Sequence, residues 1–294
     1  MAALKLSPKG TYLVLVLAST FLQGSSFVST KVIISDIPPL WTAAGRFLVA
    51  ALTLIPVVII QMRKAHLKLA SLPWGKLVII GALQTAGVMA FLNMGLVSIA
   101  PPTAAIIMAS NPLLVIILAR LFLHERSSLS TILGMIIAFA GVVICIGIPD
   151  GRQEGTGVML VILASSCWAC ATVFNKKCQL PLSPWIITFW QMLLGSLFLS
   201  VAAALGETAP ALPSTPYHWL MFLWLAIPAS TGAMGLWFAA LRLGGSVQTS
   251  GFLFLCPLFA ALIAFMLYGQ TPSTHQLFGA LIIAAGLVAM SRRR

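Results

Sequence analysis

The sequence predicts an all-α integral membrane protein with ten transmembrane helices arranged as two inverted five-helix repeats. The first observation is composition, since 60% of the residues are hydrophobic, 7% are charged and the mean hydropathy is +1.05, as is typical of membrane proteins. The second is an internal repeat, in which Pro112 recurs as Pro257, an offset of 145 residues. The third is that each copy holds an odd number of spans, so the second copy enters the bilayer from the opposite side.

Ten apolar stretches have the length of a membrane span. A bilayer core about 30 Å thick requires roughly 20 apolar residues in a helix. The predicted spans cover residues 11–32, 40–61, 76–97, 103–123, 129–148, 157–177, 185–205, 217–240, 247–268 and 275–291. Their connections are short, so we expect only two domains, residues 1–149 and 150–294, each of them one five-helix repeat.

The repeat holds at residue types that seldom match by chance. Trp74 aligns with Trp219, and Pro39 aligns with Pro184, both without a gap in the offset. Such internal similarity identifies a repeat architecture. Transporters with inverted repeats bind their substrate at the interface of the repeats, so we expect a site between the two halves.

The net charge of +12 indicates orientation in the membrane. In the ten-span arrangement most basic residues fall on one side, and only Lys31 and Arg152 fall on the other. An excess of Lys and Arg marks the cytoplasmic side, so both termini are predicted to be cytoplasmic. This distribution argues against nucleic-acid binding and leaves the basic residues to attract anionic lipid headgroups.

Catalytic and metal-binding chemistry finds no support in the sequence. The five acidic residues and the four histidines map to span ends or loops, whereas acid-base catalysis needs such groups in a cavity and proton coupling needs them at membrane depth. Cys167 and Cys170 form a CxxC pattern without a nearby His or acid, so we expect them to pack. We predict no metal, no cofactor, no enzyme activity and no proton coupling through a buried carboxylate.

Polar side chains inside the spans mark a candidate substrate site, because burying them in lipid is costly unless they face a cavity or a partner. Gln23 and Ser26 share one helix face in the first span, and Trp168, Thr172 and Asn175 share one in the sixth. Alternatively, a Ser or Thr hydroxyl can bond back to its own helix. The candidate substrate-binding residues are Gln23, Ser26, Trp41, Gln84, Phe91, Asn93, Thr103, Asn111, Trp168, Thr172, Asn175, Trp237, Phe238, Gln248 and Phe252.

Two cations and two prolines complete the prediction. Arg46 and Lys31 are candidates for binding a substrate carboxylate, although Lys31 could instead extend to the membrane interface. Pro112 and Pro257 interrupt helices at equivalent positions and are candidate gating hinges, with a static kink as the alternative. Glu125 is expected to form an ion pair with Arg120 or Arg126 that fixes the corner after the fourth span.

These residues resemble a known family. The stretch GSSFVSTK ending the first span, Trp41 followed by Arg46, and the pattern of Pro112, Glu125, Gly134 and Gly141 with its repeat are similar to the EamA family of the drug/metabolite transporter superfamily. The resemblance covers the whole chain. One departure is that Gln23 stands before Gly24, where the family often has Trp.

The resemblance implies a carrier in the bacterial inner membrane that exports aromatic or other neutral amino acids and related small metabolites by alternating access. The alternatives are a nucleotide-sugar carrier or a broad drug and metabolite carrier, and a membrane enzyme is less favoured. The expected partners are a small-molecule substrate and the lipid bilayer, with no nucleic acid. The oligomeric state stays open, and a monomer could suffice.

Overall fold

The structure is a computed structural model that describes residues 8–34, 36–96, 98, 104, 107–125, 127–146, 155–268 and 274–291. These residues form helices and contain no strand. The first half contains α1 (Pro8–Ile33), α2 (Pro39–Lys64), η1 (Leu69–Ser71), α3 (Trp74–Ile80), η2 (Gly81–Gly87), α4 (Val88–Leu96), α6 (Asn111–Phe122) and α7 (Leu129–Ile146).

The second half repeats this order of elements. It contains α8 (Gly155–Cys178), α9 (Pro184–Gly206), α10 (Pro216–Ala226), η3 (Ile227–Gly232), α11 (Ala233–Gly244), α12 (Ser246–Gly251), η4 (Phe252–Leu255), α13 (Cys256–Tyr268) and α14 (Thr274–Ser291). Asn111 begins α6 and Cys256 begins α13, which keeps the offset of 145 residues. The predicted division at residues 149 and 150 lies outside the described residues and stays a prediction.

Helix lengths agree with the predicted membrane spans. Among the described residues, five helices are long and apolar enough to cross a bilayer: Pro39–Lys64, Trp74–Gly95, Gly155–Cys178, Pro184–Gly206 and Pro216–Gly244. Shorter apolar helices cover Ile107–Phe122, Leu129–Ile144, Ser246–Phe259 and Leu277–Met290. Together with α1 they account for the ten predicted spans, so the all-α fold of two five-helix repeats is confirmed.

Helix starts follow local sequence signals. Pro39, Pro184 and Pro216 occupy the first turns of α2, α9 and α10, where a missing backbone N–H breaks no helical hydrogen bond. Ser183 caps α9 by accepting a hydrogen bond from the Ile186 N–H at 3.2 Å. These starts place α2 and α9 side by side, with a shared apolar core that includes Phe47.

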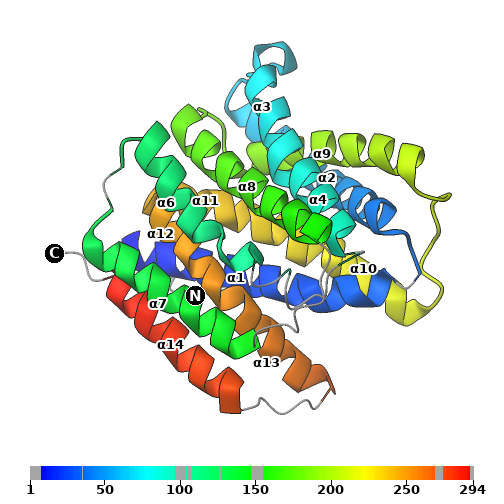
Figure 1. Ribbon diagram of the computed structural model, residues 1–294. Helices are drawn as coiled ribbons and strands as arrows, with labels where there is room; N and C mark the ends of the chain where they lie inside the picture. Colours follow the sequence, from blue (N-terminus) through cyan, green and yellow to red (C-terminus); the bar gives the residue numbers. More distant parts are fainter. Residues whose placement is uncertain are drawn as a thin grey trace, which may run out of the picture.

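Helices from the two halves pack against each other across the molecule. Figure 1 shows α7 and α14 side by side, and α1 lies against α11 and α13. Trp237 on α11 is fully buried within the core that α2 and α9 share. Large apolar side chains such as Leu205, Leu281 and Met159 remain exposed on the outside, as a lipid-facing surface requires.

Gly134→Ala is expected to lower the free energy of unfolding by about 1–3 kcal/mol, the usual cost of overpacking. A Cβ atom at Gly134 would lie 2.6 Å from the carbonyl oxygen of Gly286 and 2.6 Å from the nitrogen of Met290 on α14. Gly75→Ala is a matched control, since a Cβ atom there meets nothing within 4 Å. Thermal unfolding in detergent measures the difference, and equal melting temperatures would contradict the close packing of α7 on α14.

The two prolines proposed as hinges lie inside the apolar helical stretches Ile107–Phe122 and Ser246–Phe259, next to an interruption in each. Pro112 lies in the first turn of α6, directly after a turn at Ser110. Pro257 lies in the first turn of α13, after the 3₁₀ segment η4. Both spans thus depart from regular α-helix directly before the proline, where a backbone N–H is missing from the helical stretch. Their role in gating stays a prediction.

Wide π-helical turns interrupt the third and eighth spans as well. The segments η2 and η3 end at Gly87 and Gly232, again 145 residues apart. Such turns insert an extra residue into a helix and often occur at functional sites. They place Gln84 and Ser230 in the interior of the molecule.

Candidate functional site

Buried polar atoms without a hydrogen-bond partner concentrate on helices that carry the candidate substrate-binding residues. Leaving such an atom unpaired costs about 1–3 kcal/mol, so these atoms are available to water or to a substrate. Within the described residues they are Gln23 Oε1, Gln84 Oε1 and Nε2, Asn111 Oδ1, Ser165 Oγ, Trp168 Nε1, Thr172 Oγ1, Asn175 Nδ2, Trp190 Nε1 and Trp237 Nε1.

One face of α8 carries three of these atoms. Trp168, Thr172 and Asn175 are four and three residues apart, so their side chains follow one another along the helix. The indole of Trp168 meets that of Trp237 on α11 edge to face, with ring centroids 6.3 Å apart. Two indole N–H donors and a hydroxyl are thus unpaired beside an aromatic surface, an environment suited to a molecule with both polar and apolar parts.

Gln84 contributes an entire unpaired amide. Its side chain is buried in η2, and neither its oxygen nor its nitrogen has a partner. The next residue behaves differently, because Thr85 donates a hydrogen bond to Gln191 Oε1 on α9 at 2.6 Å. Since α8 packs on η2, Gln84 belongs to the same region of the interior as the polar face of α8.

Gln23 and Asn111 are each held by one hydrogen bond and leave their amide oxygen unpaired. Gln23 Nε2 donates to Ser19 Oγ at 2.9 Å, and Ser19 in turn donates to the carbonyl oxygen of Ala233 at 2.8 Å. Asn111 Nδ2 donates to the carbonyl oxygen of Ser165 at 2.8 Å. These bonds connect α1 to α11 and α6 to α8, and they orient two acceptor oxygens within the interior.

Three other predicted site residues have partners within the protein. Ser26 donates to the carbonyl oxygen of Gln23 on its own helix at 2.7 Å, which is the alternative noted for hydroxyl groups. Asn93 donates to the carbonyl oxygen of Pro39 at 3.0 Å, and the Trp41 indole donates to that of Thr208 at 2.8 Å. These contacts give the three side chains a structural role; their contribution to substrate binding stays a prediction.

The remaining candidates differ in environment. Phe238 is buried in the core, and Phe252 meets Tyr12 edge to face at 6.0 Å. Phe91 on α4 and Gln248 on α12 are half-buried. Thr103 and the side chain of Lys31 lie outside the described part of the structure.

Arg46 is buried and tied to the second half of the protein. Its Nε and Nη2 atoms donate to Ser230 Oγ in η3 at 3.0 and 2.8 Å, and its guanidinium lies 4.6 Å from the ring centroid of Phe47. No carboxylate forms an ion pair with it among the described residues.

Glu125 makes a second connection between the halves, because it accepts a hydrogen bond from Ser246 at 2.9 Å. The predicted ion pair of Glu125 with Arg120 is not present among the described residues, and Arg126 lies outside them.

Two cavities lie near the ends of helices that carry basic residues. One of about 370 Å³ is lined by Asn175, Lys176, Gln179, Leu180, Leu241 and Arg242. The other, of about 280 Å³, is lined by Gln61, Lys64, Ala65, Leu67, Pro181, Ser183 and Ile186. Of the predicted site residues, Asn175 lines the first of these.

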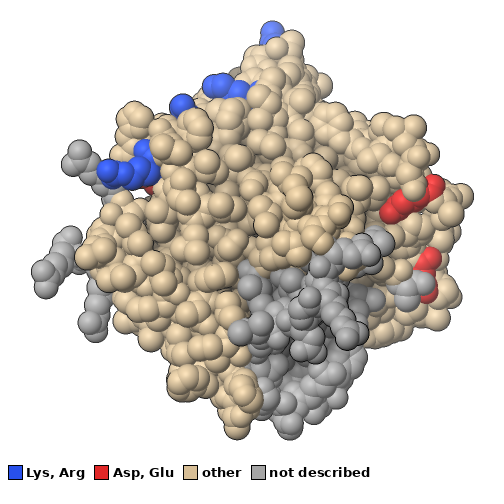
Figure 2. All heavy atoms as spheres, in the orientation of Figure 1, with Lys and Arg blue, Asp and Glu red and all other residues tan. Residues whose placement is uncertain are grey.

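Basic and acidic side chains gather at different parts of the surface. Figure 2 shows the Lys and Arg side chains at the top and left of the molecule, with a small acidic spot beside the left group, whereas two larger acidic patches lie on the right. We name the end with Lys64, Lys176 and Arg242 the basic end, and the end with Asp36 and Glu207 the acidic end. That the basic end faces the cytoplasm stays a prediction from the distribution of Lys and Arg in the sequence.

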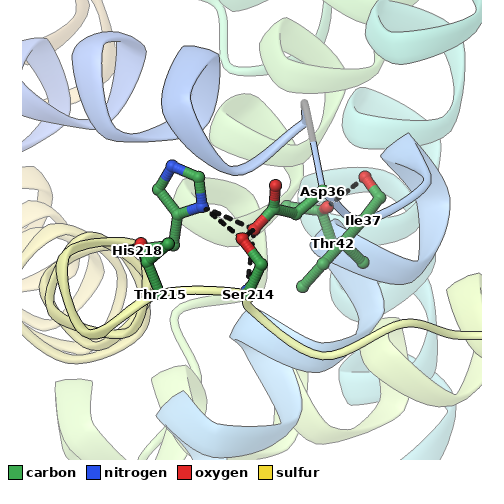
Figure 3. Close-up of polar contacts among 6 residues, drawn as sticks. All are labelled: Asp36, Ile37, Thr42, Ser214, Thr215 and His218. Carbon is green, nitrogen blue, oxygen red and sulfur yellow. Dashed lines mark hydrogen bonds and ion pairs between the residues drawn. The ribbon is translucent and has the colours of Figure 1, made fainter.

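At the acidic end, Asp36 joins the loop after α1 to the loop before α10. Asp36 Oδ2 accepts hydrogen bonds from the Ser214 hydroxyl at 2.6 Å and the Ser214 backbone N–H at 2.8 Å, and lies 2.5 Å from His218 Nδ1 (Figure 3). Ser214 Oγ approaches the same ring nitrogen at 3.2 Å. A hydrolytic triad places serine and carboxylate on opposite nitrogens of the imidazole. The cluster, which we name the acidic clasp, therefore connects two loops and does not form such a triad.

A second carboxylate strengthens the same connection. Glu207 accepts hydrogen bonds from the backbone N–H groups of Leu40 and Trp41 at 2.8 and 3.0 Å. A negative charge at the start of a helix satisfies otherwise unpaired N–H groups and is favoured by the helix dipole. The end of α9 thereby caps α2, and with the acidic clasp it fastens this end of the molecule.

Acidification is expected to open the acidic clasp only below about pH 4. Hydrogen bonds from the Ser214 side chain and backbone lower the pKa of Asp36 from 3.8 to about 2. A lowered pKa means that the ionised group contributes stability above its unfolded pKa and loses it as the pH falls through about 2. Asp36→Asn should remove this acid dependence, which melting temperatures between about pH 5 and about pH 2 would measure. The same acid dependence in wild type and Asp36→Asn would contradict the role of the clasp.

Several of these residues gave little or no signal in the sequence. Ser230 resembles many small polar residues that ease helix packing, so its contact with Arg46 was missed. The acidic clasp joins residues about 180 positions apart, with Asp36 and His218 separated by 182 residues. Glycine and threonine occur in both π turns, but small residues of this kind are common in membrane helices and mark neither turn.

Taken together, the helix lengths, the internal repeat and the polar interior define a multi-pass α-helical membrane protein. The sequence matches the EamA-like transporter family twice, over residues 10–147 and over residues 155–292. The chain belongs to this family. Its two matches also coincide with the two halves described above.

Several similar proteins match most of this chain, and two of the following three carry a transporter or efflux-pump name. "Protein PecM" of Dickeya dadantii is 29% identical over 91% of this chain and 90% of its own length. A "Probable amino-acid metabolite efflux pump" of Salmonella typhimurium is 28% identical over 90% of this chain and 89% of its own. The "Uncharacterized transporter YyaM" of Bacillus subtilis is 25% identical over 95% of this chain and 92% of its own length. A solved crystal structure matches with a TM-score of 0.82 over 95% of this chain and 96% of that chain, and at 16% identity it shows the shared fold alone.

Proposed function

We propose that this protein exports aromatic or other neutral amino acids and related small metabolites across the bacterial inner membrane by alternating access. The observation that carries the proposal is the set of unpaired buried polar atoms on α1, η2, α6, α8 and α11. They supply donors and acceptors at the same time, as a zwitterionic substrate requires. The aromatic pair Trp168 and Trp237 supplies an apolar surface beside them.

The name of the Salmonella relative supports amino acids as the substrate class. We also propose, from the sequence, that the chain is most like the aromatic amino acid exporter YddG, which favours aromatic substrates. The position of Gln23 before Gly24, in place of the family's common Trp, favours a site with more hydrogen-bonding capacity on α1. Ser19 and Ala233 orient the Gln23 amide, so its free oxygen is available to an ammonium group. This contact would recognise the amino group of the substrate.

Transport is proposed to proceed without proton coupling through a buried carboxylate. The described acidic residues are Asp36, Glu125 and Glu207, and each lies at or beyond the end of a helix. Each also accepts hydrogen bonds that fix it in place, from Ser214, Ser246 and the start of α2 respectively. Proton-coupled carriers usually hold such a group at membrane depth.

Counterflow into proteoliposomes tests the proposal. Purified protein is reconstituted, the vesicles are loaded with unlabelled phenylalanine, and uptake of labelled phenylalanine and a panel of neutral amino acids is measured at equal pH. We expect uptake that an imposed proton gradient does not change and that Trp168→Ala reduces. Uptake of none of the amino acids would refute the substrate class, and uptake only with a proton gradient would refute uncoupled transport.

A further inference from the structure

We propose that the cavity of about 370 Å³ at the basic end is a loading site for the substrate, in which Lys176 and Arg242 bind its carboxylate. The inference rests on the proposed function, because it assumes that the substrate is a small carboxylate-bearing molecule. It assigns to two residues at this cavity a role that the sequence suggested for Arg46 and Lys31. The cavity has the size of ordinary small-molecule sites, which span roughly 300–1,000 Å³.

The cavity forms where the last turns of α8 and α11 meet. The backbone at Gln179 has a φ of 41°, a left-handed conformation that is uncommon for a residue other than glycine. This turn ends α8 and brings the next stretch of chain over α11, where Arg242 Nη2 donates to the carbonyl oxygens of Leu180, at 3.0 Å, and of Leu182. From the other side, Lys176 Nζ lies 3.5 Å from the carbonyl oxygen of Leu241. The two cationic side chains are therefore held in the same cavity wall from different helices.

Both cations retain donors for an anion. Their contacts in the structure are backbone carbonyl oxygens, and neither forms an ion pair with a carboxylate among the described residues. A guanidinium group has several N–H donors, and the bonds of Arg242 use Nη2. Two positive charges without a counter-charge in one cavity favour a carboxylate, since charged hydrogen bonds to such groups are the strong ones.

The cavity borders the end of the polar face of α8. Asn175, which precedes Lys176, lines the cavity and has a buried Nδ2 atom without a partner. Thr172 and Trp168 present further unpaired atoms on the same face toward the middle of the helix. Eight residues of helix rise about 12 Å, so Lys176 is too far along α8 for one amino acid to contact it and Trp168 together. Lys176 and Arg242 therefore form a first contact, from which the substrate moves inward.

The repeat makes this site one-sided. By the offset of 145 residues, Lys176 corresponds to Lys31 and Arg242 corresponds to Val97. A pair of cations thus occurs in the second copy alone. Positive side chains at helix C-termini also interact favourably with the helix dipole, and this purely structural role is the alternative that the experiment must separate from carboxylate binding.

The experiment measures counterflow of labelled phenylalanine in proteoliposomes for wild type, Lys176→Gln and Arg242→Gln. We expect the KM of both variants to rise roughly tenfold to a hundredfold, which corresponds to the loss of a charged hydrogen bond. Lys177→Gln is the matched control, because its ammonium group lies over the Phe122 ring at 5.7 Å and its side chain does not line the cavity. Its KM should equal that of wild type.

A second measurement uses phenethylamine, which lacks the carboxylate, as a competitor. We expect it to compete poorly with phenylalanine in wild type, and we expect this discrimination to shrink in Lys176→Gln. If Arg242→Gln does not fold, the comparison of the two compounds in wild type and in Lys176→Gln still tests the proposal. Phenethylamine that competes as well as unlabelled phenylalanine in wild type would overturn the proposal.

The anion bound by Lys176 and Arg242 could be the substrate carboxylate or a lipid phosphate. Repeating the assay in neutral phosphatidylcholine and in vesicles that also contain anionic phosphatidylglycerol distinguishes the two. Variant KM values raised in both lipids support substrate binding. The opposite outcome is that the variants have the wild-type KM in neutral lipid and lose only the change in KM that phosphatidylglycerol causes in wild type. That outcome would assign the site to a lipid phosphate and overturn the proposal. If wild type transports phenylalanine and Lys176→Gln has an unchanged KM, this inference alone fails; if wild type transports no amino acid, the proposed function fails first.

Discussion

Gln84→Leu is expected to reduce phenylalanine counterflow by about tenfold or more while leaving the protein as stable as wild type or more stable. Both polar atoms of the Gln84 amide are buried without a partner, and the residue is only 4% exposed. A leucine of similar size removes these atoms, so no unpaired group is created. A tenfold loss corresponds to roughly 1.4 kcal/mol, about one hydrogen bond to the substrate. Counterflow and thermal unfolding are measured on the same preparation.

Gln191→Leu is the matched control and should behave in the opposite way. Gln191 is also buried, but its Oε1 accepts a hydrogen bond from Thr85 at 2.6 Å. Leucine at this position leaves the Thr85 hydroxyl unpaired, and we expect a loss of about 1–3 kcal/mol of stability with little change in KM. If Gln84→Leu instead destabilises the protein and leaves transport intact, the Gln84 amide serves the fold and the site is misassigned.

The fold could be predicted from the sequence because two independent signals agree. Hydropathy sets the helix lengths, and the offset of 145 residues fixes their equivalence, as the starts of α6 and α13 show. The π turns could not be predicted, since a widened helical turn leaves the apolar character of the span unchanged. Pro112 was expected to interrupt the fourth span, and a turn at Ser110 interrupts the helical stretch Ile107–Phe122 directly before it.

The candidate site could be predicted less well, because a buried polar residue has two possible roles that look alike in a sequence. Asn93 and Gln84 are both amides in the third span, yet Asn93 donates to the Pro39 carbonyl oxygen whereas Gln84 has no partner. Which role applies depends on neighbours more than 50 positions away, such as Pro39. Periodicity places a side chain on a helix face but does not identify the group opposite to it.

Ser230→Ala is expected to lower the free energy of unfolding by about 2–3 kcal/mol, because two donors of the buried Arg46 guanidinium then lose their acceptor. Arg46→Met removes the charge together with its need for a partner, and replacing a buried charge by an apolar side chain is often tolerated. We therefore expect the double variant to be more stable than the sum of the single effects predicts. Thermal unfolding of the four proteins in a double-mutant cycle measures this coupling.

Transport by the same four proteins decides what Arg46 does. If Arg46 holds α2 to η3, Arg46→Met changes stability and leaves the discrimination between phenylalanine and phenethylamine intact. The sequence hypothesis that Arg46 binds the substrate carboxylate requires this discrimination to disappear. Because Ser230 and the Phe47 ring already engage the guanidinium, we expect the first result. Lost discrimination in Arg46→Met, together with an unchanged KM in Lys176→Gln, would move the carboxylate site from the basic end into the interior.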